Sequence, residues 1–166
     1  DINHELQEIL KEYVNDLIDD YCKGETVSGW SWAELSSEIL STFSLDIHEN
    51  NAGVDKIDEL RDLILQGANA MLSHKKELAG IDRFEGFEKF IILKTIDEKW
   101  REHLAGMDQL REGINLRAYG QKNPLIEYKR EGFGMFADMM IETNRETLRR
   151  IFRVRIGNVE AQPTQI

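Results

Sequence analysis

The chain has 166 residues, an apolar content of 41% and a formal net charge of −10 at pH 7, which is enough for one substantial core or two small ones. Its longest apolar run, Phe90–Leu93, is far shorter than the roughly 20 residues of a membrane span, and no signal-peptide pattern opens the sequence. We therefore expect a cytosolic or peripheral protein, in which the single cysteine, Cys22, excludes an internal disulfide and a cysteine-based zinc site.

The negative charge is confined to the first half of the chain. Residues 1–80 hold 17 acidic and 6 basic side chains, whereas residues 81–166 hold 14 and 15. Nucleic-acid binding needs a concentrated Lys/Arg surface, so an acidic half argues against it. Most of these charges are expected on solvated helix faces.

The first predicted element is an amphipathic helix, because apolar residues recur at intervals of three and four from Ile2 to Ile18. No capping residue precedes it, which suggests that the helix continues a longer one.

Residues 21–80 are predicted to form a small helical insert. A capping box, Ser31-x-x-Glu34, opens a short helix. Residues 45–53 contain two asparagines and a glycine and are expected to form a loop, after which helical spacing resumes from residue 54 to about residue 78.

The longest pattern follows a second capping box, Asp82-x-x-Glu85, and runs to Ile114. A helix of 33 residues would be roughly 50 Å long and needs a partner to bury its apolar stripe. Asn123-Pro124 is a good start for that partner, since it supplies a side-chain cap followed by proline in the first turn.

Residues 115–123 between the two patterns are too few to do more than reverse the chain. Two long helices joined in this way lie antiparallel, so the fold class is predicted to be all-α, a long helical hairpin with a small helical insert. Residues 157–166 lack periodicity and are expected to form a frayed, disordered tail. The expected core of the hairpin consists of Trp100, Leu104, Met107, Leu110, Tyr128, Phe133 and Phe136.

Motifs for catalysis and metal binding are missing from the sequence. It has no Gly-Lys step for a phosphate loop, and none of its four histidines follows a glutamate by three residues, as di-metal helix sites require. His103 is expected to be a packed or surface residue and Cys22 a small buried apolar one. We therefore predict no cofactor, no metal and no catalytic residue in this chain.

The hairpin tip, Leu116–Pro124, is the most informative segment. It places Tyr119 between two cations, Arg117 and Lys122, in a loop that has no hydrophobic core for the ring to pack into. A tyrosine can bind unfolded polypeptide of any sequence, because its ring is apolar and its hydroxyl can form a hydrogen bond with any backbone. The ring could equally fold back over the helix ends, and the residues alone leave both readings open.

The run from Trp100 to Phe136 resembles SecA, the bacterial ATP-driven preprotein translocase family. The resemblance is dense from Phe84 to Val154. A weaker resemblance, to the wing segment of the family, is carried by Trp30, Leu35, Ile39, Phe43, Leu45 and Asp46.

The resemblance implies that residues 1–20 end a long scaffold helix, that residues 21–80 are the helical wing, and that residues 81–156 are the scaffold with its two-helix finger. In the family the finger tip enters the SecYEG channel and its tyrosine contacts the translocating chain. That role maps onto Tyr119, with Arg117, Gln121 and Lys122 as its neighbours at the channel or peptide.

The resemblance also implies that the hairpin packs on the motor domains and restrains ATP hydrolysis. The family's nucleotide-binding folds and its zinc-binding tail are missing from these residues, so ATP, Mg²⁺ and zinc are expected only in a parent protein. The expected partners are the SecYEG channel, unfolded preprotein and the motor domains, with no nucleic acid. The expected location is the cytoplasm and the cytoplasmic face of the bacterial inner membrane. The alternative is a free-standing helical adaptor or chaperone-like module.

Overall fold

The computed structural model describes residues 1–117, 119–120 and 123–157, and within these residues every regular element is a helix. This confirms the all-α prediction. None of the described helices combines the length and hydropathy needed to cross a bilayer.

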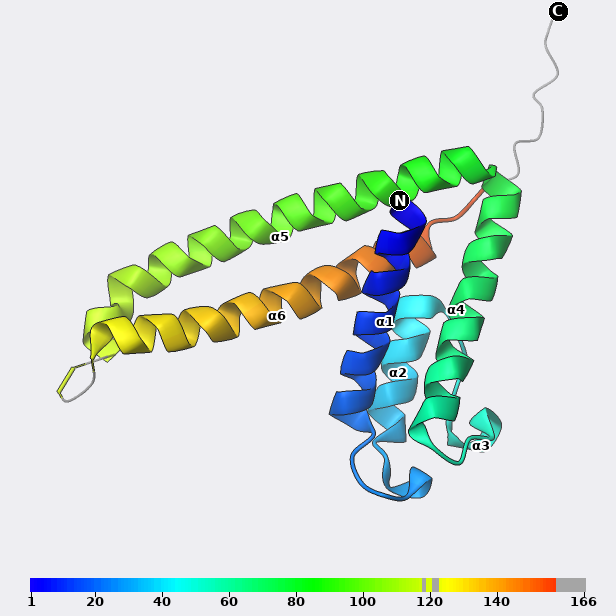
Figure 1. The fold of residues 1–166 in the computed structure, drawn as a ribbon, viewed down its shortest axis with the longest axis horizontal. Helices are drawn as coiled ribbons and strands as arrows, with labels where there is room; N and C mark the ends of the chain where they lie inside the picture. Colours follow the sequence, from blue (N-terminus) through cyan, green and yellow to red (C-terminus); the bar gives the residue numbers. More distant parts are fainter. Residues whose placement is uncertain (118, 121–122, 158–166) are drawn as a thin grey trace, which may run out of the picture.

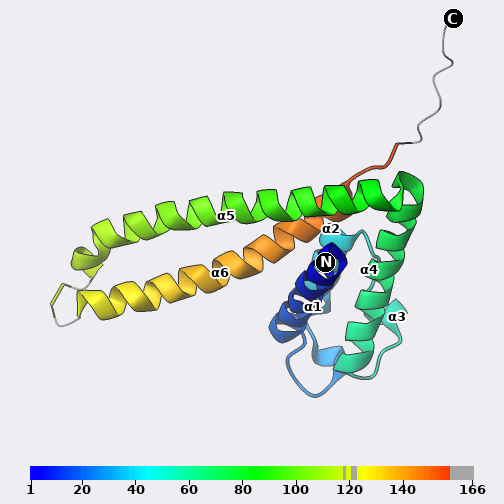
Figure 2. The same ribbon diagram turned by 45° about the horizontal axis from the view of Figure 1, so that its top comes forward.

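The molecule has two parts, a helical body and a long arm that projects from it (Figures 1 and 2). In the body, a 3-10 turn and a short helix connect three longer helices, whereas the arm consists of two helices side by side. The elements are α1 (Ile2–Tyr21), the 3-10 turn (Val27–Gly29), α2 (Trp32–Phe43), α3 (Glu49–Ala52), α4 (Ile57–Ala79), α5 (Ile81–Arg117) and α6 (Pro124–Arg153).

One hydrophobic core joins the body to the base of the arm. Phe43 of α2 lies at its centre, with its ring centroid 5.8 Å from that of Tyr13 in α1 and 5.0 Å from that of Phe152 in α6. Side chains of α4 and of the first turns of α5, such as Leu60 and Phe84, belong to the same cluster. Such edge-to-face aromatic contacts fix the relative orientation of the helices that carry them.

Helix starts agree with the predicted signals in part. Asp1 caps α1, since its Oδ1 accepts a hydrogen bond from the backbone N–H of Asn3 at 3.1 Å, so the expectation of an uncapped helix is wrong. Ser31 is the N-cap residue of α2 as predicted, but its side chain makes no capping hydrogen bond.

Two boundaries differ from those predicted. The short helix α3 lies inside the expected loop, held in place by a hydrogen bond from the backbone N–H of His48 to Oδ1 of Asn51 (2.8 Å). α5 begins at Ile81 and not behind a cap at Asp82, because Gly80 takes a φ of +90° that lets α4 end and α5 start in one residue.

The predicted hairpin is confirmed. α5 and α6 run antiparallel along the whole arm (Figure 1). α5 has 37 residues and continues to Arg117, into the segment expected to be loop. α6 starts as predicted, with Oδ1 of Asn123 accepting a hydrogen bond from the backbone N–H of Leu125 at 2.9 Å and proline in the first turn.

Candidate interaction site on the helical arm

The outer arm is held together by two reciprocal contacts between a glycine and a methionine. A Cβ added to Gly106 of α5 would lie 2.8 Å from Cε of Met135 in α6, and one added to Gly132 of α6 would lie 2.8 Å from Cε of Met107 in α5. Each methionine therefore fills the space left by a missing side chain. A flexible thioether suits such a position.

An aromatic contact follows nearer the body. The ring of Phe136 in α6 meets Trp100 of α5 edge to face at a centroid distance of 6.4 Å, and it lies 5.8 Å from His103. His103 thus packs against its neighbours, as the sequence suggested.

Only part of the predicted hairpin core is buried. Leu110 is buried, and Met107 and Tyr128 are partly covered. The other four are exposed, and their expected place in a buried core is wrong. In a two-helix arm each helix has a single neighbour, so apolar residues beside the contact line remain open to solvent. These four are Trp100, Leu104, Phe133 and Phe136.

Polar contacts fasten the inner half of the arm. Arg150 of α6 reaches α5, where it donates to Oγ1 of the buried Thr95 at 3.1 Å and pairs with Glu98 at 2.7 Å; it also pairs with Glu146 of its own helix. The hydrogen bond to Glu98 raises the pKa of Arg150 and lowers that of Glu98. Arg150 therefore connects α5 and α6 at the end of the arm that is nearest the body.

A second polar cluster joins the arm to α1 and α2 of the body. Glu38 of α2 accepts hydrogen bonds from the hydroxyl of Tyr13 at 2.8 Å and from Nη2 of Arg149 at 3.1 Å, and it pairs with Arg145 at 3.6 Å. Burial is the main cause that raises the pKa of Tyr13. Three helices, α1, α2 and α6, therefore meet at one carboxylate.

Glu88 is an unusual buried acid at the base of α5. Its side chain is fully buried, and neither carboxylate oxygen has a hydrogen-bond partner among the described residues. Nζ of Lys76 in α4 is the nearest cation, 3.7 Å from Oε1, which is beyond hydrogen-bond distance. Burial raises the pKa of Glu88, and Lys76 opposes that rise.

The tip presents its aromatic residue to solvent. Tyr119 is 90% exposed, and Leu116 beside it is also exposed. The backbone N–H of Tyr119 donates to the carbonyl of Leu116 at 3.4 Å, and Gly120 turns the chain with a φ of +101°. The structure therefore excludes a Tyr119 ring that folds back over the helix ends.

Three further residues were predicted to lie at the tip beside Tyr119. Arg117 ends α5, whereas Gln121 and Lys122 lie outside the described residues. Their expected place beside Tyr119 stays a prediction.

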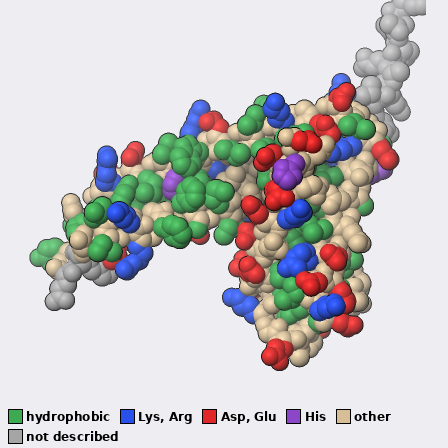
Figure 3. Space-filling view, viewed as in Figure 1, with side chains coloured by type: hydrophobic (Ala, Val, Ile, Leu, Met, Phe, Trp, Pro, Cys, Tyr) green, Lys and Arg blue, Asp and Glu red, His purple; other side chains and the backbone are tan. Residues whose placement is uncertain are grey.

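A large apolar surface runs along one side of the arm. In Figure 3 hydrophobic side chains gather over α5 and α6. We use the name arm face for eight exposed apolar residues of these two helices: Phe90, Leu93, Ile96, Trp100, Leu104, Phe133, Phe136 and Met140. Four of them, Ile96, Trp100, Phe136 and Met140, line one groove. This groove, of about 400 Å³, lies between the arm and the acidic residues Glu5, Glu8 and Glu12 of α1. The sequence analysis placed four of these residues, Trp100, Leu104, Phe133 and Phe136, in the core, because periodicity cannot tell a buried stripe from an exposed one.

In the described part of the chain, no three His, Cys, Asp or Glu side chains are placed to hold a metal ion together. Cys22 is buried, and this burial raises the pKa of its thiol to about 11, so a reactive thiolate is strongly disfavoured.

Known sequences place the chain in a family. Residues 1–155 match the family described as SecA Wing and Scaffold domain. The protein translocase subunit SecA of Vesicomyosocius okutanii is 38% identical over 161 residues, which is 95% of this chain and 18% of that protein. The subunit of Chloroherpeton thalassium is 38% identical over 90% of this chain and 14% of its own length. That of Koribacter versatilis is 36% identical over 91% and 16%.

The match covers nearly the whole chain, but this chain spans less than a fifth of the length of these three relatives. It includes the body helices as well as the arm. The chain belongs to the SecA wing and scaffold domain family.

Proposed function

We propose that this chain is a mechanical, non-catalytic part of an ATP-driven preprotein translocase, and that its arm pushes polypeptide into a SecYEG-type channel. The observation that carries the proposal is the 90% exposed ring of Tyr119 at the far end of two long helices. Because the tip lies roughly 55 Å from the start of α5, a small rotation at the base gives a large displacement there.

Contacts between α5 and α6 would keep the arm rigid along its length. Its outer half is joined by the glycine–methionine contacts, and its inner half by the contacts of Arg150 with α5. Arg149 and Glu38 connect α6 to the wing. Movement of the body is therefore transmitted to the tip without bending at the base.

The chemistry of the tip suits a substrate of variable sequence. The ring of Tyr119 offers apolar area to any side chain, and its hydroxyl can donate to or accept from any backbone amide. We propose Arg117, Gln121 and Lys122 as further contacts with the channel or the preprotein. The working location would be the cytoplasmic face of the membrane.

The test is preprotein import into inverted membrane vesicles by the parent translocase carrying Tyr119→Ala. We expect most ATP-dependent import to be lost, whereas Tyr119→Phe, which keeps the ring, retains a large part of it. Leu40→Ala, which removes an exposed apolar side chain from α2, is the matched control and leaves import unchanged. Normal import with Tyr119→Ala would refute the role of the tip.

A second function, restraint of the ATPase, is favoured by the arm face. An exposed apolar surface of this extent is a typical contact surface, and we propose that motor domains of a parent protein cover it. Phe133→Ser in the parent protein should then raise the basal ATPase rate without preprotein, while Leu40→Ser should not. An unchanged basal rate with Phe133→Ser, in a variant that still imports preprotein, would count against the restraint.

A further inference from the structure

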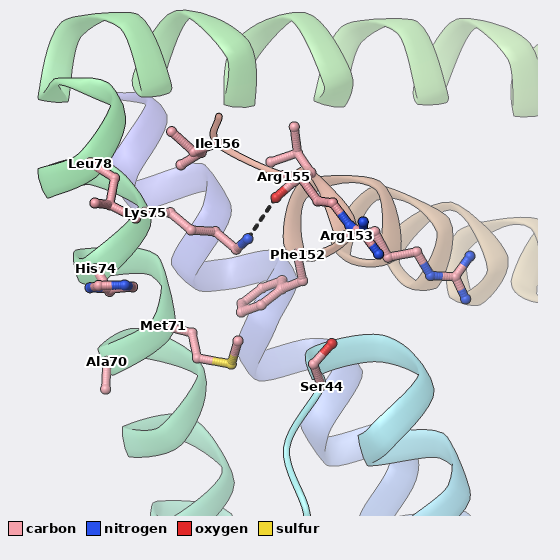
Figure 4. A pocket seen from close by; sticks show the side chains of 11 residues that line it. Ser44, Ala70, Met71, His74, Lys75, Leu78, Phe152, Arg153, Arg155 and Ile156 are labelled. Atoms are coloured by element: carbon pink, nitrogen blue, oxygen red, sulfur yellow. Dashed lines mark hydrogen bonds between the residues drawn. The ribbon is translucent and has the colours of Figure 1, made fainter. Parts of the chain in front are cut away.

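A second site lies at the opposite end of the molecule from the tip. A pocket of about 830 Å³ opens between the C-terminal half of α4 and the end of α6 with the segment that follows it (Figure 4). Its apolar wall consists of Met71 and Leu78 from α4 and Phe152 and Ile156 from the other side. The roles proposed above for the tip and the arm face do not use this pocket.

The charged residues of this pocket are all basic. Lys75, Arg153 and Arg155 line it together with His74, and no Asp or Glu is among the lining residues. This is unusual for a chain that has 31 acidic and 21 basic side chains.

Arg153, the last residue of α6, and Arg155, which follows the helix, differ from the preceding arginines of α6. Arg130, Arg145, Arg149 and Arg150 each lie within 4 Å of a carboxylate. By contrast, Arg153 and Arg155 form no ion pair with any described residue. Both are exposed and have long side chains, so they can turn toward an anion in the pocket at little cost.

Lys75 points across the pocket. Figure 4 shows its ammonium group directed at the end of α6, where Nζ donates to the carbonyl of Val154 at 2.7 Å. An ammonium group has three N–H donors, and this contact uses one of them. Burial lowers the pKa of Lys75, which means that its positive charge is incompletely compensated.

The chain beyond α6 has free backbone groups beside the same pocket. Val154 is the C-cap residue that ends α6, with φ −59° and ψ 129°. No backbone hydrogen bond from or to Arg155, Ile156 or Gly157 is found among the described residues. Backbone groups without partners can pair with the backbone of a peptide but not with a lipid chain, which favours a peptide as the occupant.

We propose that this pocket binds an extended acidic peptide of a partner protein, with its carboxylates at Lys75, Arg153 and Arg155 and an apolar side chain against Phe152 and Met71. Each carboxylate would gain a charge-assisted hydrogen bond, and the apolar side chain would cover the wall between α4 and α6.

The test is fluorescence anisotropy of a labelled octapeptide of alternating Glu and Leu with the 166-residue chain. We expect saturable binding that weakens as salt is raised to about 0.5 M, because the contacts are ionic. The double variant Arg153→Gln/Arg155→Gln should weaken binding by about two- to fivefold for each arginine removed. Arg130→Gln, which removes one positive charge from the distant part of α6, should leave the affinity unchanged.

Two further measurements keep the proposal open to refutation. Leu78→Glu places a negative charge on an exposed rim residue of the pocket and should abolish binding, with circular dichroism showing that the helices persist. A peptide with Lys in place of Glu should not bind. Equal binding of the two peptides, no binding by the unmodified chain, or binding only to vesicles of anionic phospholipid would each overturn the proposal.

Discussion

Met107 of α5 occupies the space that Gly132 of α6 leaves open. A Cβ at Gly132 would lie 2.8 Å from Cε and 3.3 Å from the sulfur of Met107, so the two helices approach each other through a glycine and a flexible side chain. This contact lies on the outer arm, beyond the body, where the hairpin has no third helix to stabilise it (Figure 2).

The first prediction concerns this contact. Gly132→Leu should have a free energy of unfolding about 1–3 kcal/mol lower than that of Gly134→Leu, because a leucine at position 132 must displace the side chain of Met107 from the contact between the helices. Gly134→Leu is the control, since a Cβ there meets nothing within 4 Å and leucine is the better helix former. Urea unfolding followed by circular dichroism measures both. Equal stability of the two variants would show that the contact is not tightly packed.

The second prediction concerns the carboxylate that joins α1, α2 and α6. Glu38→Ala leaves Arg149 without its nearest carboxylate and removes one partner of the Tyr13 hydroxyl, so we expect a loss of about 1–3 kcal/mol in unfolding free energy. The control is Glu25→Ala, an exposed position outside the helices, which should change stability by less than about 0.5 kcal/mol. Thermal unfolding of both variants is the measurement.

The third prediction concerns pH. Because burial raises the pKa of Glu88 in the folded state, the folded chain holds this proton more tightly than the unfolded chain does. The stability that protonated Glu88 contributes is therefore present below the ordinary carboxyl pKa and is lost as pH rises through the raised pKa. Glu88→Gln removes this dependence.

We accordingly expect Glu88→Gln to be more stable than the unmodified chain at pH 7, with an advantage that shrinks as pH falls toward about 4. Melting temperatures of both proteins across this range give the difference. The control is the exposed Glu77→Gln, for which the difference should be small throughout. An advantage of Glu88→Gln that does not vary with pH would contradict the argument.

The fourth prediction uses the single cysteine as a probe of the core. Burial raises the pKa of Cys22 to about 11, so a thiol reagent at pH 8 should modify the folded chain far more slowly than the chain unfolded in guanidinium. In the variant Cys22→Ser/Ser37→Cys the thiol is at an exposed position of α2 and should react at nearly the unfolded rate. Rapid modification of Cys22 in the folded chain would show that the body opens readily.

Much of the secondary structure follows from local patterns in the sequence. The spacing of apolar residues and the Asn123-Pro124 cap predicted the hairpin, because an α-helix repeats every 3.6 residues and its first turn needs side-chain acceptors. Boundaries were less well predicted. The start of α5 depends on the backbone conformation of Gly80, and the short helix α3 on hydrogen bonds that no periodic pattern signals.

The sequence by itself determined that this protein is helical, that α5 and α6 fold back on each other, and that Tyr119 lies at the turn between them. Only the tertiary structure decided which apolar stripes are covered and which are exposed, such as the residues of the arm face. It also decided which charges meet, since Glu38 and Arg149 are 111 positions apart in the chain. The physical reason is that helices form from contacts within a few residues, whereas burial and ion pairing depend on the packing of distant elements.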